Sequence, residues 1–154
     1  MAASGKIKTK NRARIAIVAS RFNEVITKDL LQACLARLRS QGVEDNRIST
    51  VWVPGAFEIP LTALKLAKRK NVDGVICLGA VIRGQTYHFE VVSNECARGI
   101  MEASLLAAKP VILGVLTVDT LAQARARSKP QGAGNKGRDS ADAVLQMVAL
   151  LEKI

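Results

Sequence analysis

Four short apolar runs, separated by longer segments of helical period, constrain the fold of this chain more than any other feature. They cover residues 14–20, 48–53, 73–79 and 110–116. Near-continuous apolar runs of this length are typical of strands in a parallel sheet that is covered on both faces. Strand alternating with helix indicates right-handed crossovers between parallel strands. We therefore predict an α/β fold, a three-layer α/β/α sandwich with a four-stranded parallel, flavodoxin-like sheet.

The segments between the runs carry the start and stop signals of helices. Asn23 or Thr27 can cap a first helix, and Gly42 suits its C-terminal end. Pro60 fits the first turn of a second helix, expected at about 59–70, because an N–H in that turn would be unpaired anyway. Further helices are expected at about 89–108, 120–127 and 140–153. Every predicted strand is thus followed by a helix.

Length and composition allow one domain and exclude several classes of protein. The chain has 154 residues, of which 49% are apolar and 23% charged, as in an ordinary globular domain. Its longest apolar runs are far shorter than the roughly 20 residues of a membrane span, so we expect a soluble protein with no membrane partner. Its three cysteines have no spacing typical of a disulfide framework or a zinc site, which indicates a reducing compartment such as the cytoplasm.

Basic residues concentrate at the N-terminus. The net charge is +10, and residues 1–14 hold five basic residues and no acidic one. We interpret residues 1–13 as an arm that is solvated or pairs with a sheet edge, and residues 14–154 as a single domain. The arm lacks the apolar stretch of a secretory signal, and the remnant of a transit peptide is the alternative. The charge suits anions such as phosphates. We expect no nucleic-acid partner, because the aromatic rings are too few and too clustered for a stacking platform.

Aromatic side chains gather where the predicted strands end. Four of the five aromatic residues, and the only histidine, fall in the loops that follow the strands. These residues are Phe22, Phe57, Tyr87, Phe89 and His88. Ligands of open parallel sheets bind at the carboxyl ends of the strands. We therefore expect the functional site at this edge of the sheet.

Two glycine-rich segments resemble phosphate-binding motifs to different degrees. Residues 79–86, GAVIRGQT, have the outline of a phosphate loop, with Gln85 in place of the lysine. Backbone N–H groups of such a turn can hold a phosphate, and a plain strand-to-helix turn is the alternative. Residues 132–137, GAGNKG, match the dinucleotide fingerprint by letter but follow a predicted helix rather than a strand, so we interpret their glycines as a flexible loop.

Three polar residues are candidates for chemistry, each with a structural alternative. His88 carries the side chain best suited to proton transfer near neutrality, although a lone histidine is more often structural. Glu58 and Arg127 can serve a ligand or simply complement the charged ends of helices. We expect no metal site, because His88 lacks partner ligands. No serine or cysteine nucleophile is expected either.

Several segments, in register, are similar to the lumazine synthase family of riboflavin biosynthesis. They are VPGAFEIP at 53–60, GAVIRGQTYHFE at 79–90, GVLTVDTLAQA at 114–124 and GNKG at 134–137. The resemblance spans about residues 14–153. It implies condensation of 5-amino-6-(D-ribitylamino)uracil with 3,4-dihydroxy-2-butanone 4-phosphate to 6,7-dimethyl-8-ribityllumazine, phosphate and water. It implies no metal or organic cofactor. A non-catalytic flavin or lumazine carrier on the same fold is the alternative.

The resemblance also implies roles for individual residues. His88 would be catalytic and would move protons during imine formation, phosphate loss and ring closure. Phe22 would stack on the pyrimidine, and Glu58 would accept hydrogen bonds from the ribityl hydroxyls. The remaining pyrimidine- and ribityl-binding residues would be Ala56, Phe57, Ala80, Val81, Ile82, Leu113 and Lys136. The phosphate would be bound by Gln85, Thr86 and Arg127.

In the family, each site lies between adjacent subunits of a cyclic pentamer. Leu113 and Arg127 would then come from the neighbour of the chain that provides Phe22 and His88. This chain departs from the family at Leu113, where an aromatic residue is common. It departs again in the loop SKPQGAGNKG at 128–137, which is about one residue longer and contains a proline. Because a proline restricts the backbone where pentamers would meet, we predict an isolated pentamer rather than a capsid.

Overall fold

The computed structural model describes residues 11–154, in which strands and helices alternate. The strands are β1 (Ile15–Ser20), β2 (Ile48–Val53), β3 (Gly74–Ile82) and β4 (Val111–Val118). The helices are α1 (Glu24–Ser40), α2 (Ile59–Ala67), α3 (His88–Ala107), α4 (Leu121–Ser128) and α5 (Lys136–Leu151), with single 3-10 turns η1 (Asp45–Arg47) and η2 (Ala56–Glu58). No helix of this part of the chain is long and apolar enough to cross a membrane.

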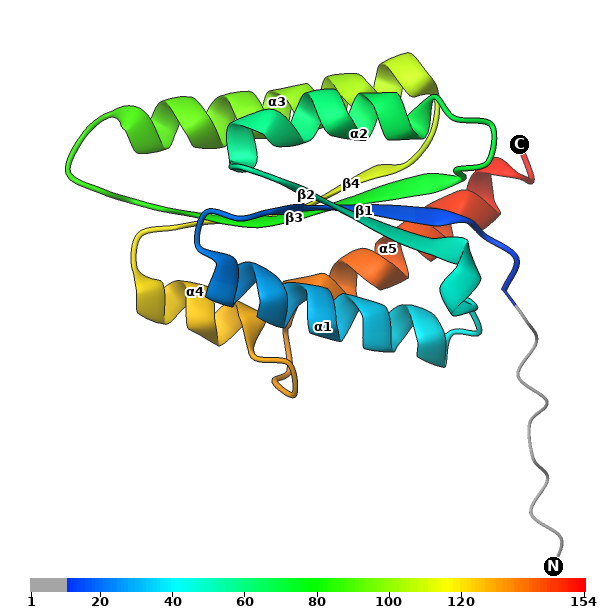
Figure 1. Ribbon diagram of the computed structural model, residues 1–154, viewed down its shortest axis with the longest axis horizontal. Helices are drawn as coiled ribbons and strands as arrows, with labels where there is room; N and C mark the ends of the chain where they lie inside the picture. The colour runs from blue at the N-terminus through cyan, green and yellow to red at the C-terminus, as the bar shows by residue number, and fades with distance from the viewer. Residues whose placement is uncertain (1–10) are drawn as a thin grey trace, which may run out of the picture.

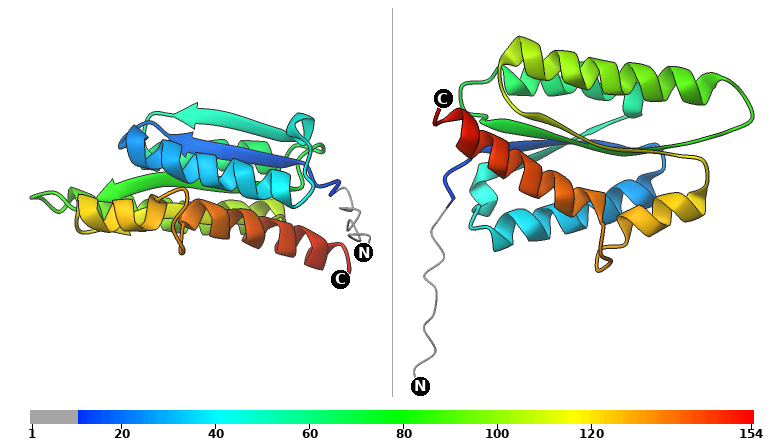
Figure 2. Two further views of the ribbon diagram at one scale, coloured as in Figure 1. Left: turned by 90° about the horizontal axis from the view of Figure 1, so that it is seen from below. Right: turned by 180° about the vertical axis from the view of Figure 1, so that it is seen from behind.

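The four strands form one parallel sheet in the order β2-β1-β3-β4. Helices α2 and α3 cover one face of the sheet, and α1, α4 and α5 cover the other (Figure 1). The view from behind shows the same two helical layers with the sheet between them (Figure 2). The predicted three-layer α/β/α sandwich with a flavodoxin-like sheet is confirmed.

Each face of the sheet has its own apolar core, which explains the continuous apolar runs. Successive side chains of a strand point to opposite faces. In β1, Ile15 and Ile17 belong to the core under α1 and α5, whereas Ala16 and Val18 belong to the core under α2 and α3. All six residues of β1 are buried. A strand covered on both faces has no position for a polar residue that faces water.

Strands β3 and β4 run further than the sequence predicts. β3 was expected to end at residue 79 and β4 at 116, but they stay paired through Ala80–Leu116, Val81–Thr117 and Ile82–Val118. The predicted phosphate-loop outline is therefore wrong for residues 79–82, which are strand. Only the connection from Arg83 to Tyr87 is free to form a turn.

Helix α5 begins at Lys136 rather than near residue 140. Asn135 caps it: the side-chain oxygen accepts a hydrogen bond from the Arg138 N–H at 3.0 Å. The side-chain amide of Asn135 donates to the carbonyls of Ser128 at 2.8 Å and Lys129 at 3.0 Å, and the residue is only 1% exposed. The predicted flexible loop is therefore wrong for residues 135–137. A helix, α4, precedes the segment, so the dinucleotide motif lacks its strand.

Residues 11–13, expected to lie in the N-terminal arm, contact the domain. The Asn11 N–H donates to the Gly42 carbonyl at 3.1 Å, and Asn11 forms a β-bridge with Val43. Ala13 is buried in the core under α1. Most of the predicted arm, and its pairing with a sheet edge, falls on residues 1–10, which lie outside the described residues.

Gly137 lies where α5 crosses the backbone of α1. A Cβ atom at this position would lie 2.0 Å from the Leu30 carbonyl oxygen, well inside van der Waals contact. Because main-chain atoms of a packed helix cannot yield as a flexible side chain can, only glycine fits without moving α5. The close approach gives the last glycine of the GNKG segment a packing role.

We predict that Gly137→Ala lowers the free energy of unfolding by about 1–3 kcal/mol, the usual cost of overpacking, measured by urea denaturation. Gly84→Ala is the matched control, because a Cβ at Gly84 would meet nothing within 4 Å. If α5 could shift without cost, alanine would instead stabilise the helix by about 1 kcal/mol. The sign of the change in unfolding free energy therefore shows whether the close approach of α5 to α1 requires glycine.

Candidate active site

A cavity of about 730 Å³ opens at the carboxyl end of the parallel strands. It lies among the β1–α1 connection, the η2 segment, the end of β3 and the start of α3. Nine residues predicted for the site line it: Phe22, Ala56, Phe57, Glu58, Ala80, Val81, Ile82, Thr86 and His88. Gln85 stands between the lining residues Gly84 and Thr86. The structure thus brings most of the predicted residues around one space.

The loop that carries Phe22 is tied to both neighbouring strands. The Arg21 N–H donates to the Val53 carbonyl at 2.8 Å, and the Phe22 N–H donates to the Pro54 carbonyl at 3.1 Å. Asn23, at φ 57°, does not cap α1 with its side chain. Its amide instead donates to the Ala80 carbonyl at 2.8 Å. Phe22 is 72% exposed on this fixed loop, which leaves its ring available to a flat ligand.

The β2–α2 connection presents an apolar ring and a free carboxylate to the cavity. Phe57 is 57% exposed, whereas Ala56 beside it is buried and anchors η2 to the core under α2. Among the residues that the structure describes, the Glu58 carboxylate has no hydrogen-bond or ion-pair partner. Gly55 leaves room for it, since a Cβ there would lie 3.1 Å from Glu58 Oε2. Glu58 therefore offers unused acceptors at the rim, next to the start of α2.

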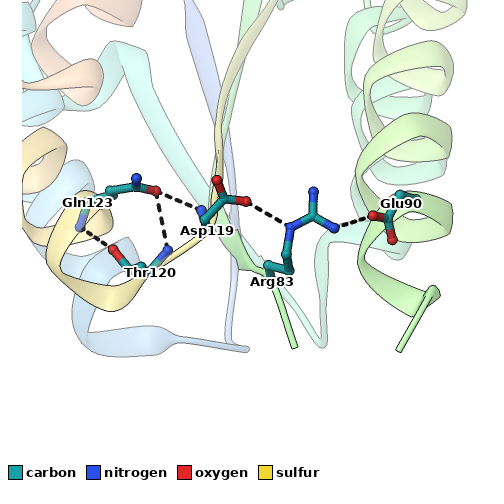
Figure 3. Close-up of polar contacts among 5 residues, drawn as sticks. All are labelled: Arg83, Glu90, Asp119, Thr120 and Gln123. Atoms are coloured by element: carbon teal, nitrogen blue, oxygen red, sulfur yellow. Dashed lines mark hydrogen bonds and ion pairs between the residues drawn. The ribbon is translucent and has the colours of Figure 1, made fainter. Parts of the chain in front are cut away.

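Arg83, directly after β3, forms the polar junction of the site (Figure 3). Its N–H donates to the Val118 carbonyl at 2.9 Å, and its Nε donates to Asp119 Oδ1 at 2.8 Å. Nη1 donates to the Glu90 carboxylate in α3, and the guanidinium carbon lies 4.4 Å from the centre of the Phe89 ring. The arginine thereby joins the β3–α3 connection to the β4–α4 connection.

The far side of this junction is held by the first turn of α4. Gln123 Oε1 accepts hydrogen bonds from the N–H groups of Asp119 at 2.7 Å and Thr120 at 3.3 Å. Thr120 Oγ1 in return accepts from the Gln123 N–H at 3.1 Å, which completes a capping box. Asp119 is thus fixed in place as the partner of Arg83, as Figure 3 shows.

Sequence reasoning missed Arg83 and two valines on α3. Val91 and Val92 line the cavity, and their spacing of three and four residues from His88 on a helix was the signal that could have found them. Phe89 also lines the cavity, at the rim position that the sequence predicts for it. For Arg83 the sequence offered no signal, because both of its carboxylate partners depend on the fold.

Besides Gln85, three predicted residues do not line this cavity. Leu113 lies within β4, paired with Cys77, and is 51% exposed. Arg127 lies on α4 and donates to the Gln123 carbonyl at 3.1 Å. Lys136, the first residue of α5, pairs with Asp139 at 3.2 Å. Helices α4 and α5 cover the face of the sheet opposite α3, so one copy of the chain does not gather all the predicted residues.

Cysteine and metal chemistry find little support in residues 11–154. All three cysteines are free and buried. Burial raises the thiol pKa of Cys34 to about 12 and that of Cys96 to about 11, so neither forms a thiolate near neutrality. Burial also raises the pKa of Cys77. No group of three or more His, Cys, Asp or Glu residues that could hold a metal ion occurs in this range.

An open parallel sheet with a rim cavity lined by rings and a few polar groups is typical of α/β proteins that bind small molecules. Comparison with protein-family models matches residues 12–152 to 6,7-dimethyl-8-ribityllumazine synthase. The match covers nearly the whole chain and agrees with the motifs found in the sequence. The chain therefore belongs to the 6,7-dimethyl-8-ribityllumazine synthase family, transferases of riboflavin biosynthesis.

We predict that Glu90 titrates below its usual range and that Arg83→Met raises its pKa. The pKa of Glu90 is lowered chiefly by the hydrogen bond from Arg83, which favours the charged carboxylate. The contact is therefore present at neutral pH and is lost as the pH falls through the lowered pKa. Carbon-detected NMR of the carboxyl group measures the midpoint. Arg98→Met, which removes an arginine elsewhere on α3, should leave that midpoint unchanged; an equal rise in both variants would contradict the assignment.

Proposed function

We propose that this protein condenses 5-amino-6-(D-ribitylamino)uracil with 3,4-dihydroxy-2-butanone 4-phosphate and releases 6,7-dimethyl-8-ribityllumazine, phosphate and water. The observation that carries the proposal is the convergence of Phe22, Glu58 and His88 on one cavity in a chain of this family. Each residue meets a different need of the reaction. Phe22 offers a flat surface, Glu58 offers oxygens that accept hydrogen bonds from hydroxyl groups, and His88 offers a group that can carry a proton.

The pyrimidine side of the site is built from rigid parts. The exposed ring of Phe22 offers a π-face to the heterocycle. Backbone groups of Ala56 and Phe57, and of residues 80–82, are suited to the polar edge of the uracil. The unpaired carboxylate of Glu58 is suited to accept hydrogen bonds from the ribityl hydroxyls.

The phosphate side is the connection that ends in α3. Gln85 and Thr86 lie just before this helix of 20 residues, whose positive N-terminal end attracts anions. The guanidinium of Arg127 has the fork that phosphate oxygens fit. Lys136, in contrast, pairs with Asp139 at the start of α5 and would serve the pyrimidine.

His88 would transfer protons as the imine forms, the phosphate leaves and the ring closes. It is the first residue of α3 and faces the cavity beside Thr86. An imidazole can accept and return a proton near neutral pH. Holding the amine and the ketone together in one site would supply much of the remaining rate.

We propose further that adjacent copies complete the site in an isolated pentamer. Leu113, Arg127 and Lys136 lie outside the cavity of their own chain, and a neighbouring copy is the natural source of their counterparts. β2 is an edge strand with exposed residues at its centre, a surface on which another chain could pair. The three free cysteines support a reducing compartment, and we place the enzyme in the cytoplasm.

We predict that His88→Ala lowers kcat for the condensation by about a hundredfold, the usual contribution of a positioned general acid or base. The KM for the pyrimidine should change little, because the ring of Phe22 and the carboxylate of Glu58 remain. Steady-state formation of the lumazine measures both. Phe22→Ala is the counterpart, which should raise that KM. Unchanged kcat in the histidine variant would remove His88 from its role, and binding of the product without any turnover in the parent protein would indicate a carrier.

We predict that coexpressed His88→Ala and Arg127→Ala chains regain activity that neither has alone. If each site takes one residue from each of two neighbours, up to about a quarter of the sites in a random ring keep both. Sedimentation velocity on the parent should show a species of five chains. No recovery in mixed oligomers would contradict a shared site, and a capsid-sized species would contradict the isolated pentamer.

A further inference from the structure

Arg83 links two segments of the rim that no other side-chain hydrogen bond or ion pair joins in the part of the chain described. One carboxylate partner, Glu90, belongs to the first turn of α3, and the other, Asp119, belongs to the β4–α4 connection (Figure 3). The guanidinium also lies over the ring of Phe89. Arg83 does not itself line the cavity. Its side chain therefore acts on residues of the site rather than on a ligand.

The turn that precedes His88 has few polar attachments of its own. Among the described residues, the hydrogen bonds of Gly84–Tyr87 stay inside the turn and α3. The His88 N–H donates to Thr86 Oγ1 at 3.4 Å, and the Tyr87 carbonyl accepts from the N–H groups of Glu90 and Val91. All four residues of the turn are exposed, and a Cβ at Gly84 would meet nothing within 4 Å, so packing holds the turn little. Its position is set at its two ends, by Arg83 and by α3.

We propose that Arg83 is a positioning residue that fixes the Gly84–Tyr87 turn and the first turn of α3 against the end of β4. The inference rests on the proposed function, since these segments carry the phosphate-binding turn and His88. Glu90 lies two residues after His88, and Phe89 is its direct neighbour. Anchoring both to Arg83 sets where the imidazole stands relative to the backbone N–H groups of Gln85 and Thr86.

The chemistry of the contact requires arginine. Two nitrogens of one rigid plane reach carboxylates that come from different elements, while the face of the plane covers a ring. A lysine ammonium has the charge but neither the fork nor the flat face. The raised pKa of Arg83, caused first by Asp119 and then by Glu90, agrees with a guanidinium held between two carboxylates.

Partial exposure separates this role from a purely stabilising one. The side chains of Arg83, Glu90 and Asp119 are 44%, 30% and 63% exposed. Ion pairs that face water contribute little to global stability. Loss of the junction should therefore change the kinetics and raise the local mobility of α3. The midpoint of global unfolding should change little.

The test compares Arg83→Met with Arg98→Met in the assembled protein. Arg98 is also an exposed arginine of the chain with two carboxylate partners, Glu95 and Glu102, both on α3. In Arg83→Met we expect kcat/KM for the butanone phosphate to fall about tenfold, because small displacements of reacting groups are costly. The KM for the pyrimidine should stay within about twofold, because the backbone that carries Phe22 and Glu58 is held by contacts that do not involve Arg83. Arg83→Lys should fall between the parent and the methionine variant, and Arg98→Met should match the parent.

A double-mutant cycle tests whether the junction acts as a unit. Asp119→Asn alone should reduce kcat/KM for the butanone phosphate in the same direction as Arg83→Met. Combining the two should cost no more than Arg83→Met alone, because both remove the same contact. Fully additive losses would overturn the proposal. So would parental kinetics in Arg83→Met, or equal losses in Arg83→Met and Arg98→Met.

Amide hydrogen exchange tests whether Arg83 fixes the turn before α3, by a measurement that does not depend on turnover. The Glu90 and Val91 amides, which donate to the Tyr87 carbonyl, should exchange at least about tenfold faster in Arg83→Met and at the parental rate in Arg98→Met. Unchanged exchange in Arg83→Met would overturn the proposal.

A parent that does not condense the two substrates would refute the proposed function, while the exchange comparison would still decide whether Arg83 holds the turn. If Arg83→Met does not fold, Arg83→Lys and Asp119→Asn provide the same comparison.

Discussion

The pairing of β3 with both β1 and β4 is the constraint on which the rest of the structure depends. The first seven residues of β3 are buried, with a helical layer on each face. Parallel pairing brings the carboxyl ends of neighbouring strands to one edge, so the connections after β1, β2 and β3 open together. The last residues of β3 and the residue after it then serve as attachment points: the Ala80 carbonyl accepts from Asn23, and the Arg83 N–H donates to Val118.

Most of the fold could be predicted because its causes are local in the sequence. A strand between two helical layers must be apolar at every position, and β1 shows this without exception. The site was predictable to the same degree, since the aromatic residues follow the strands and parallel topology decides where they meet. Phe22, Phe57 and His88 reach one cavity for that reason alone. Their chemical roles came from the family resemblance, not from the pattern.

What could not be predicted depends on contacts between distant segments. Residues 80–82 look like the start of a loop, and only the pairing with β4 makes them strand. Lys136 begins a helix because Asn135, which reads as a loop residue, is buried against the end of α4. Arg83 is one arginine among many in a basic chain. It acquires its significance from Asp119, which lies 36 residues away in the sequence.

The burial of Asn135 determines how the α4–α5 connection tolerates a change in length. Its three hydrogen bonds hold both ends of the α4–α5 connection, and the Arg138 guanidinium of α5 donates to the carbonyls of Pro130 and Gly132 within that connection, each at 3.0 Å. Residues gained or lost between these contacts would move the carbonyls that Arg138 binds, but not those that Asn135 binds. A longer or shorter loop would therefore change the outer contour of the protein beside α4, while the Asn135 cap of α5 and the lining of the cavity keep their contacts.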